Sequence, residues 1–308
     1  MTNSSNILRL KELKEKNNAI ILAHYYVEPE IQEIADFLGD SLALAQQAKE
    51  TDADVILFCG VKFMAETAKI LNPQKIVLMP DVSTGCSLAD LSPASDLKEW
   101  KNSFENPFLV SYINCSAEVK AISDVICTSS NAEKILKSIP KDKTILFATD
   151  RYLGSYIKEK LGIEMKVWKD YCVVHQNFSE EHLLKLIENN ADAEVVAHPE
   201  CSDNLLKYAD FVGSTTGIIN YTKENSSNKF IVLTELGILH QLQKLSPHKE
   251  FLMVNNIEGE CNICKDMKKN TIEGMILALE NLSPQIIIDE DLRKKALIPL
   301  ELMLKLSE

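Results

Sequence analysis

Three cysteines are spaced along the chain so that each could come from a separate structural unit. Cys86, Cys172 and Cys264 are 86 and 92 residues apart, and each follows an apolar run typical of a β-strand. One thiolate from each of three units could hold a metal centre where the units meet. A centre with only three protein ligands keeps one coordination position open for substrate, as catalytic metals do. The spacing therefore predicts a catalytic metal centre.

A second cysteine pattern is compatible with a different kind of metal site. Cys261 and Cys264 form a Cys-x-x-Cys motif, which is typical of zinc and redox sites. A zinc site made by Cys86, Cys172, Cys261 and Cys264 is compatible with this motif. The chain holds 8 cysteines, and a reducing cytosol favours free thiols or metal ligands over disulfides.

The elements that must position these cysteines alternate between short apolar runs and segments of helix length. This pattern is typical of parallel α/β units. The repetition predicts three α/β units of similar design, each contributing one cysteine, followed by a helical segment at 271–308. The predicted strands form three groups of three, at 19–25, 55–59 and 75–79, at 107–113, 125–128 and 144–148, and at 193–197, 211–213 and 229–233. The predicted domains are 1–86, 87–172 and 173–264, with 265–308 returning to the first.

Polar residues follow these strands, at the sheet edge where parallel α/β proteins bind ligands. The first strands of the three groups end close to His24, Asn114 and His198, and the second strands end at 59–61, 128–131 and 213–216. Because the ends of the strands correspond between groups, we expect three sub-sites that face one another. The third strands of all three groups end at an acidic residue, namely Asp81, Asp150 and Glu235.

Two kinds of side chain at these ends could act on a substrate. His198 and Glu200 place an imidazole and a carboxylate two residues apart, which suits general acid–base catalysis. Ser41, Ser129 and the pair Ser214 and Thr215 lie where helices are predicted to begin. A hydroxyl group there either caps the helix or binds an anion, and both interpretations stay open.

The composition restricts the class of protein. The 308 residues carry a net charge of −12, which argues against nucleic acid because phosphate binding depends on basic residues. The longest apolar runs are far shorter than the roughly 20 residues of a membrane span, and the amino-terminal residues lack the apolar stretch of a signal peptide. We therefore expect a cytoplasmic protein that acts on small molecules.

Several motifs, in order along nearly the whole chain, are similar to those of one family. They are AHYY at 23–26, ADFLGDSL at 35–42, FMAETAKIL at 63–71, GCS at 85–87, TSSNA at 128–132, YCVVH at 171–175, HPEC at 198–201 and GST at 213–215. Together they resemble quinolinate synthase, the A protein of bacterial NAD biosynthesis. So many ordered motifs make a chance resemblance a poor explanation.

The resemblance implies a fold, a cofactor and a reaction. It implies three similar α/β/α domains with short parallel sheets, in a pseudo-threefold arrangement around a central [4Fe–4S] cluster. Cys86, Cys172 and Cys264 match the family's three cluster ligands, and the iron without a cysteine would act as a Lewis acid. In the implied reaction, iminoaspartate and dihydroxyacetone phosphate condense to quinolinate with release of phosphate and water. L-aspartate oxidase would supply the iminoaspartate.

The resemblance also assigns roles to residues. Tyr26, His198 and Glu200 match catalytic positions, and Glu200 and His198 are expected to move protons with help from Tyr26. The matching substrate-binding positions are His24, Ser41, Tyr112, Asn114, Ser129, Ser214 and Thr215.

One motif departs from the family pattern. Many members carry Cys-x-x-Cys-x-x-Cys near the carboxyl terminus, whereas this chain has only Cys261 and Cys264. The family pattern places the ligand three residues before the methionine of a Met-Lys pair, here Met267, which selects Cys264. Cys261 is then spare, and an oxidised bridge between Cys261 and Cys264 would remove a cluster ligand.

Two other functions fit some of these residues. A zinc-dependent lyase or hydrolase on the same scaffold would lack the brown colour and labile sulfide of an iron–sulfur protein. A metal-sensing or redox module would fill the cluster with a fourth protein ligand. The many His, Tyr, Asn and Glu side chains at the strand ends disfavour this module, because a sensor has no need of them.

Overall fold

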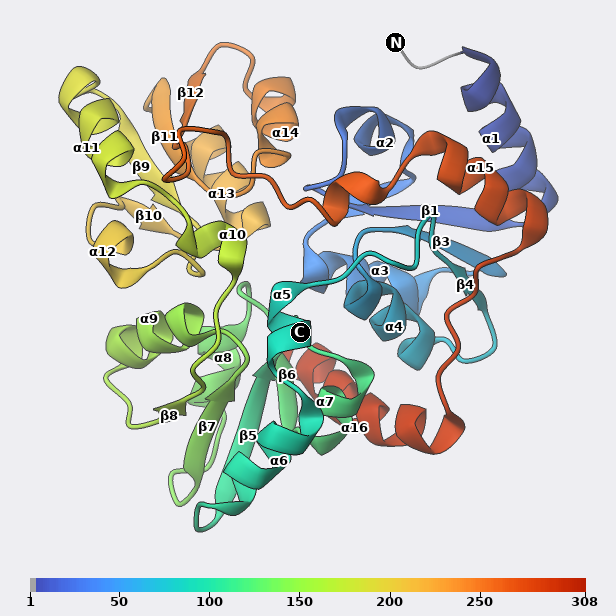
Figure 1. The fold of residues 1–308 in the computed structure, drawn as a ribbon, viewed down its shortest axis with the longest axis horizontal. Helices are drawn as coiled ribbons and strands as arrows, with labels where there is room; N and C mark the ends of the chain where they lie inside the picture. The colour runs from blue at the N-terminus through green and yellow to red at the C-terminus, as the bar shows by residue number, and fades with distance from the viewer. Residues whose placement is uncertain (1–3) are drawn as a thin grey trace.

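The computed structural model describes residues 4–308, which form three small parallel sheets placed around a common centre (Figure 1). Each sheet has four strands, and all the pairings are parallel. The predicted α/β class, with three similar units, is confirmed. The first sheet is made by β1 (Ala19–His24), β2 (Phe37–Gly39), β3 (Val55–Cys59) and β4 (Ile76–Leu78), the second by β5 (Pro107–Tyr112), β6 (Val125–Cys127), β7 (Thr144–Ala148) and β8 (Lys166–Val167), and the third by β9 (Glu194–Ala197), β10 (Phe211–Val212), β11 (Lys229–Leu233) and β12 (Glu250–Met253).

The three sheets have the same topology. In each, the second strand along the chain lies at one edge beside the first, and the third and fourth follow on the other side: β2-β1-β3-β4, β6-β5-β7-β8 and β10-β9-β11-β12. The central strands are almost continuously apolar, as expected for strands covered on both faces, and all of β3 is buried.

One hydrogen bond repeats at the same place in every unit. Asp36, Asp124 and Asp210 each precede the edge strand, and each accepts a backbone N–H from the first strand, 15 residues earlier in the chain. The donors are Ile21, Leu109 and Val195, at 2.8, 2.7 and 2.8 Å. Identical spacing in three units shows that they are variations of one design, although their sequences differ.

Each sheet contains one strand more than the sequence pattern predicts. The unpredicted strands are β2, β8 and β12, of which β2 and β8 have only three and two residues. In the first unit this shifted the correspondence between units. The predicted equivalence of Asp81 with Asp150 and Glu235 is therefore wrong, since Asp81 follows β4 whereas the other two follow β7 and β11. The residue equivalent to them, two positions after β3, is Val61.

Helices connect the strands and cover the sheets. Several begin at a side chain that accepts a backbone N–H, including Asp40 before α3, Asp150 before α9 and Ser214 before α13. The helices are α1 (Ser4–Lys16), α2 (Pro29–Ile34), α3 (Ser41–Glu50), α4 (Lys62–Leu71), α5 (Ser87–Leu91), α6 (Ala94–Asn102), α7 (Ala117–Ile122), α8 (Ala132–Lys137), α9 (Arg151–Leu161), α10 (Val173–Gln176), α11 (Glu180–Asn189), α12 (Asp203–Leu206), α13 (Thr215–Glu224), α14 (Ile238–Leu245), α15 (Ile272–Asn281) and α16 (Glu290–Ser307), with a 3₁₀ turn at Met267–Lys269. Within residues 4–308, no helix combines the length and the apolar character that crossing a membrane requires.

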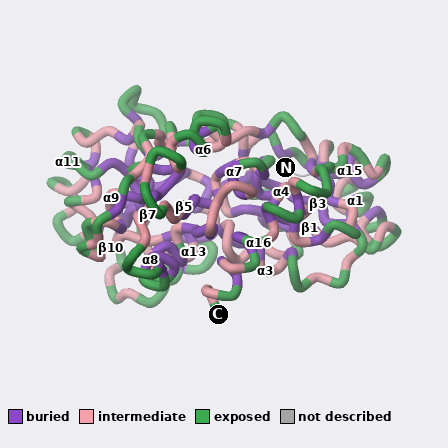
Figure 2. Tube along the Cα trace, turned by 90° about the horizontal axis from the view of Figure 1, so that it is seen from below, coloured by how far each residue is buried: buried purple, intermediate pink, exposed green. Residues whose placement is uncertain are grey.

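The carboxyl-terminal helices tie two units together. After the third unit the chain returns to the first, where α15 packs against α1, and α16 then lies against α7 and β6 of the second unit (Figure 1). The molecule is a flattened body with buried parts of the chain in its interior and exposed parts at its surface (Figure 2). Leu300 and Met303 of α16 are fully buried, whereas Ile298 is 67% exposed. The helix therefore stabilises the contact between units through one apolar face.

We predict that Leu300→Ala lowers the free energy of unfolding by about 2–5 kcal/mol, because it removes buried methyl groups and leaves a cavity against the second unit. Ile298→Ala, on the solvent side of the same helix, should change it by less than about 0.5 kcal/mol. Urea denaturation followed by circular dichroism measures both. Equal destabilisation by the two variants would contradict the packing of α16 described here.

Candidate functional site

A cavity of about 720 Å³ lies where the carboxyl ends of the three sheets meet. This is the edge at which parallel sheets bind ligands. All the residues predicted for the site line it except Ser214: Cys86, Cys172 and Cys264 with His24, Tyr26, Ser41, Tyr112, Asn114, Ser129, His198, Glu200 and Thr215. The Ser214 hydroxyl accepts the backbone N–H of Gly217 at 3.1 Å, so it caps α13, and it borders a separate cavity of about 480 Å³.

Strand register explains why these residues converge. Ala23, Ser111 and Ala197 occupy the same position in the three sheets, opposite Cys59, Ala148 and Leu233. The residue after each is His24, Tyr112 or His198, and two positions further lie Tyr26, Asn114 and Glu200. The same register on the edge strands makes Ser41, Ser129 and Thr215 equivalent. The cavity is thus lined by three sets of equivalent positions, one residue of each set from each unit.

Hydrogen bonds between units close this ring of strand ends. The Tyr26 hydroxyl of the first unit lies 2.9 Å from the Thr215 hydroxyl of the third. In the third unit, His198 Nε2 lies 3.2 Å from the Ser129 hydroxyl of the second. Ser130 donates to Asp40 at 2.9 Å, which links the second unit to the first. Side chains from all three units therefore hold one another in place around the cavity.

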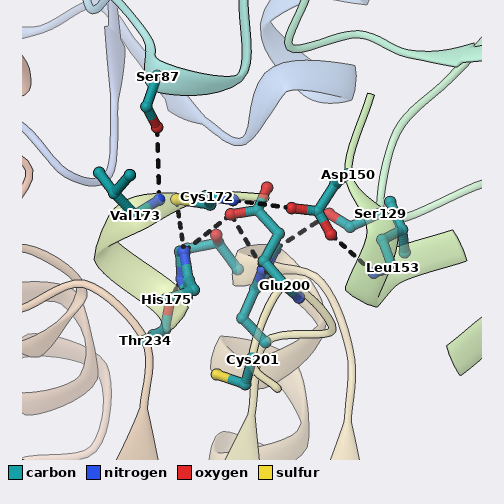
Figure 3. A network of polar contacts seen from close by, with 12 residues as sticks. Ser87, Ser129, Asp150, Leu153, Cys172, Val173, His175, Glu200, Cys201 and Thr234 are labelled. Atoms are coloured by element: carbon teal, nitrogen blue, oxygen red, sulfur yellow. Dashed lines mark hydrogen bonds and ion pairs between the residues drawn. The ribbon is translucent and has the colours of Figure 1, made fainter. Parts of the chain in front are cut away.

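Glu200 lies at the centre of a buried polar network (Figure 3). Its Oε2 is 2.8 Å from His175 Nδ1, and the same nitrogen is 3.3 Å from the Cys172 Sγ. His175 Nε2 bonds the Thr234 hydroxyl at 3.0 Å, and Thr234 in turn lies 2.7 Å from the Tyr26 hydroxyl. A continuous chain of hydrogen bonds thus connects Tyr26 to Glu200 across the units.

His175 and Thr234 were not among the predicted site residues. His175 is three residues after Cys172, on the one-turn helix α10, and this Cys-x-x-His spacing was the available signal. Thr234 directly follows β11, where a contact with another unit cannot be read from local sequence. Cys172, His175 and Glu200 bring one sulfur, one nitrogen and one oxygen atom within 4.8 Å of one another, which makes them a possible metal site.

The electrostatics separate the roles of the ionisable groups. Burial raises the pKa of the Glu200 carboxyl, but its interaction with His175 and the hydrogen bonds from His175 and Tyr112 outweigh this effect and bring the pKa to about 2. Burial lowers the pKa of His24 to about 4 and that of His198 to about 3. At neutral pH the cavity therefore holds an ionised Glu200 between uncharged His24 and His198. Burial also raises the pKa of the Tyr26 and Tyr112 hydroxyls, so both remain proton donors.

The three predicted ligand cysteines lie at equivalent places in the fold and line the same cavity. They come from the loops after β4, β8 and β12, the equivalent fourth strands of the three units, and all line the one cavity. Burial is the main cause that raises the pKa of Cys86 to about 12, that of Cys264 to about 11 and that of Cys172 well above its usual value. Buried thiols of this kind bind as thiolates only when a positive charge offsets the cost, and metal ions supply that charge.

Two buried polar atoms facing the cavity lack a partner within the described chain. They are Asn114 Oδ1 and Asn262 Nδ2, and Asn262 lies between Cys261 and Cys264. A buried donor or acceptor without a partner is costly, so such atoms indicate a bound group that completes their hydrogen bonds. The three cysteines and the two side-chain amide groups without a hydrogen-bond partner both fit a cavity that holds a cofactor and a polar ligand. Cys261, in contrast, is exposed at the cavity rim.

Comparison with known proteins agrees with this geometry. A family model described as quinolinate synthetase A protein matches residues 8–305. A quinolinate synthase of Prochlorococcus marinus is 53% identical over 300 residues, which cover 97% of this chain and 90% of the relative. Those of Gloeothece citriformis and a Synechocystis species are 51% and 52% identical, over 97% of this chain and 93% and 94% of their own. Since the family model and these relatives span nearly the whole sequence, the chain belongs to the quinolinate synthetase A protein family.

Proposed function

We propose that this protein is a quinolinate synthase of NAD biosynthesis, which condenses iminoaspartate with dihydroxyacetone phosphate and releases phosphate and water. The observation that carries the proposal is the convergence of one cysteine, one hydroxyl and two further polar side chains from each unit on one cavity. Membership of the family and the names of the relatives support the reaction. The protein would act in the cytoplasm on small molecules, supplied with iminoaspartate by L-aspartate oxidase.

Cys86, Cys172 and Cys264 would hold a [4Fe–4S] cluster, one thiolate from each unit. When bound, the cluster supplies a Lewis acid at the iron that lacks a cysteine. Three thiolates at one cavity match the ligand number of such a cluster, and sulfur ligands favour iron–sulfur chemistry over magnesium or calcium. The remaining residues of the cavity then bind the organic substrates and move their protons.

The substrates are anions, whereas the protein carries a net charge of −12. Local donors must therefore attract them. The hydroxyls of Ser41, Ser129 and Thr215 come from equivalent positions and line the cavity, where they can surround the oxygens of a phosphate or carboxylate. Uncharged His24 and the Tyr112 hydroxyl add donors without adding a competing anion. We assign these residues and Asn114 to substrate binding.

Proton transfer falls to the network of His198, Glu200 and Tyr26. Glu200 is ionised, so it can accept a proton from a carbon next to a carbonyl or imine group, as a general base does. His198 is uncharged and also able to accept a proton, and its Nε2 is held by Ser129. Tyr26 keeps its proton and can donate it to a leaving hydroxyl, with Thr234 and His175 connecting it back to Glu200. Enolisation and dehydration both require such paired donors and acceptors.

A mononuclear metal is the second candidate, because Cys172, His175 and Glu200 together offer the mixed ligands that zinc prefers. Metal analysis distinguishes the two candidates. Protein purified without oxygen should be brown and contain about four irons and four sulfides per chain if the cluster is present. A colourless protein that contains zinc and no sulfide would instead favour the zinc enzyme.

We predict that Cys86→Ser, Cys172→Ser and Cys264→Ser each lose most of the bound iron and all quinolinate formation, because each removes one of three ligands. Cys261→Ser should keep both, since Cys261 is exposed and is not assigned to the cluster. Iron content and visible absorbance after anaerobic reconstitution provide the measurement. Loss of the cluster from Cys261→Ser together with its retention in Cys264→Ser would overturn the assignment of the third ligand.

We also predict that Glu200→Gln lowers turnover about 10²–10⁴-fold, the usual contribution of a general acid or base, while the iron content stays unchanged. The glutamine has nearly the same shape, so it preserves packing and removes only the ionisable group. Glu194→Gln, at the opposite end of the strand that leads to Glu200, serves as the control and should retain turnover. Full activity of Glu200→Gln would exclude the carboxylate from proton transfer.

A further inference from the structure

Two of the ligand cysteines share a backbone contact with a buried acid. The backbone N–H of Cys172 donates to Asp150 Oδ2, and that of Cys264 donates to Glu235 Oε1, both at 3.1 Å. Figure 3 shows the first of these contacts between the Asp150 carboxylate and Cys172. Asp150 and Glu235 are both 0% exposed. Each cysteine is therefore anchored by an acidic side chain that solvent does not reach, and burial raises the pKa of both acids, that of Asp150 well above its usual value.

The two acids occupy equivalent positions in their units. Asp150 lies two residues after β7 and Glu235 two residues after β11, and these strands are equivalent in their sheets. The loops that carry the cysteines differ in length, since Cys172 follows β8 by five residues and Cys264 follows β12 by eleven. The shared contact therefore does not result from similar loops. It is a feature of the site that both units retain.

The first unit lacks this device. Its equivalent position is Val61, whose side chain has no hydrogen-bond acceptor, and the loop of Cys86 is held by a different contact. The backbone N–H of Gly85 donates to Asp266 Oδ1 at 3.1 Å, and Asp266 lies two residues after Cys264. The ligand loop of the first unit thus depends on that of the third, which depends in turn on Glu235.

The other carboxyl oxygen of each acid accepts a backbone N–H from a residue two or three positions later in the chain. Asp150 Oδ1 accepts the N–H of Leu153 at 2.7 Å and so caps α9, while Glu235 Oε2 accepts the N–H of Gly237 at 2.6 Å. A serine or asparagine would serve a helix cap equally well. An acidic side chain has a second acceptor oxygen. In Asp150 and in Glu235 this second oxygen accepts the backbone N–H of the ligand cysteine.

This second contact has a consequence for a bound cluster. Hydrogen bonds from nearby N–H groups to cluster sulfur atoms are among the features that set its reduction potential. An N–H group that donates to a carboxylate is not available to donate to sulfur. A cluster used as a Lewis acid gains nothing from easy reduction, since the reaction involves no net electron transfer.

We propose that Asp150 and Glu235 are positioning residues, which fix the ligand loops of Cys172 and Cys264 and withhold their N–H groups from the cluster sulfurs, so that the cluster resists reduction. This inference rests on the proposed function, because it concerns the cluster assigned there. It adds Asp150 and Glu235, the second of which also lines the cavity, to the residues assigned above.

The test uses Asp150→Asn and Glu235→Gln in the full-length protein. An amide side chain has one acceptor oxygen where two backbone N–H groups now bind, so one contact must be released. At Glu235 the Lys268 ammonium also lies 3.3 Å from Oε1, the oxygen that accepts the Cys264 N–H. We expect the shorter contacts, to Leu153 and Gly237, to be kept and the cysteine amides to be freed. Asp124→Asn is the matched control, because Asp124 also accepts a backbone N–H, from Leu109 at 2.7 Å, and does not line the cavity.

The reduction potential of the reconstituted cluster, measured by titration followed by electron paramagnetic resonance, is the main readout. We expect an upward shift in Asp150→Asn and in Glu235→Gln and no shift in Asp124→Asn. Unchanged potentials in both variants, with iron retained, would overturn the proposal and reduce the two acids to structural roles. A wild-type protein that forms no cluster would instead defeat the proposed function, so the two failures are distinguishable.

A second measurement covers the case in which Asp150→Asn does not fold because its helix cap is weakened. Alkylation of the cluster-free protein, located by mass spectrometry, should then show Cys264 reacting several times faster in Glu235→Gln than in wild type, with the rate for Cys261 unchanged. Equal rates for Cys264 in the two proteins would show that Glu235 does not fix the loop.

Discussion

The structure depends on hydrogen bonds between buried polar side chains at the junction of three sheets. No unit contains a complete site, since each contributes one cysteine and a few strand-end residues. A buried polar group without a partner is costly, so the strand ends must satisfy one another across the junction. The Tyr26 hydroxyl illustrates this, since it lies between Thr215 and Thr234 of the third unit, at 2.9 and 2.7 Å. The cavity is therefore complete only when the three units are in contact.

The repeated fold places equivalent residue positions around the cavity, and different residues at these positions give the cavity different functional groups. Equivalent places hold His24, Tyr112 and His198 in one set and Tyr26, Asn114 and Glu200 in another. Three identical residues would give a symmetric site with one kind of group. The differences instead place an ionised carboxylate, uncharged imidazoles and protonated phenols around one volume, which a reaction with several proton transfers requires.

Much of this could be predicted from sequence because the signals are local. Apolar strands such as β3 and β11, and polar residues directly after them, indicated the sheets and the edge at which the cavity lies. The edge strands β2 and β8 could not be predicted, because two or three residues carry no periodicity and are fixed by pairing with a neighbour. Because β2 was not predicted, Asp81 was matched with the wrong positions of the other two units. His175 and Thr234 could not be predicted for a related reason. They contact Glu200 and Tyr26, which lie in distant parts of the chain.

The central claim is that three cysteines hold a cluster whose remaining iron is open to substrate. Mössbauer spectroscopy of protein reconstituted with ⁵⁷Fe, with and without quinolinate, tests it most directly. We expect about one iron in four to change its isomer shift and quadrupole splitting when quinolinate is added, while the others stay as they were. Four irons that are indifferent to quinolinate would show a cluster closed by a fourth protein ligand and would exclude an open iron.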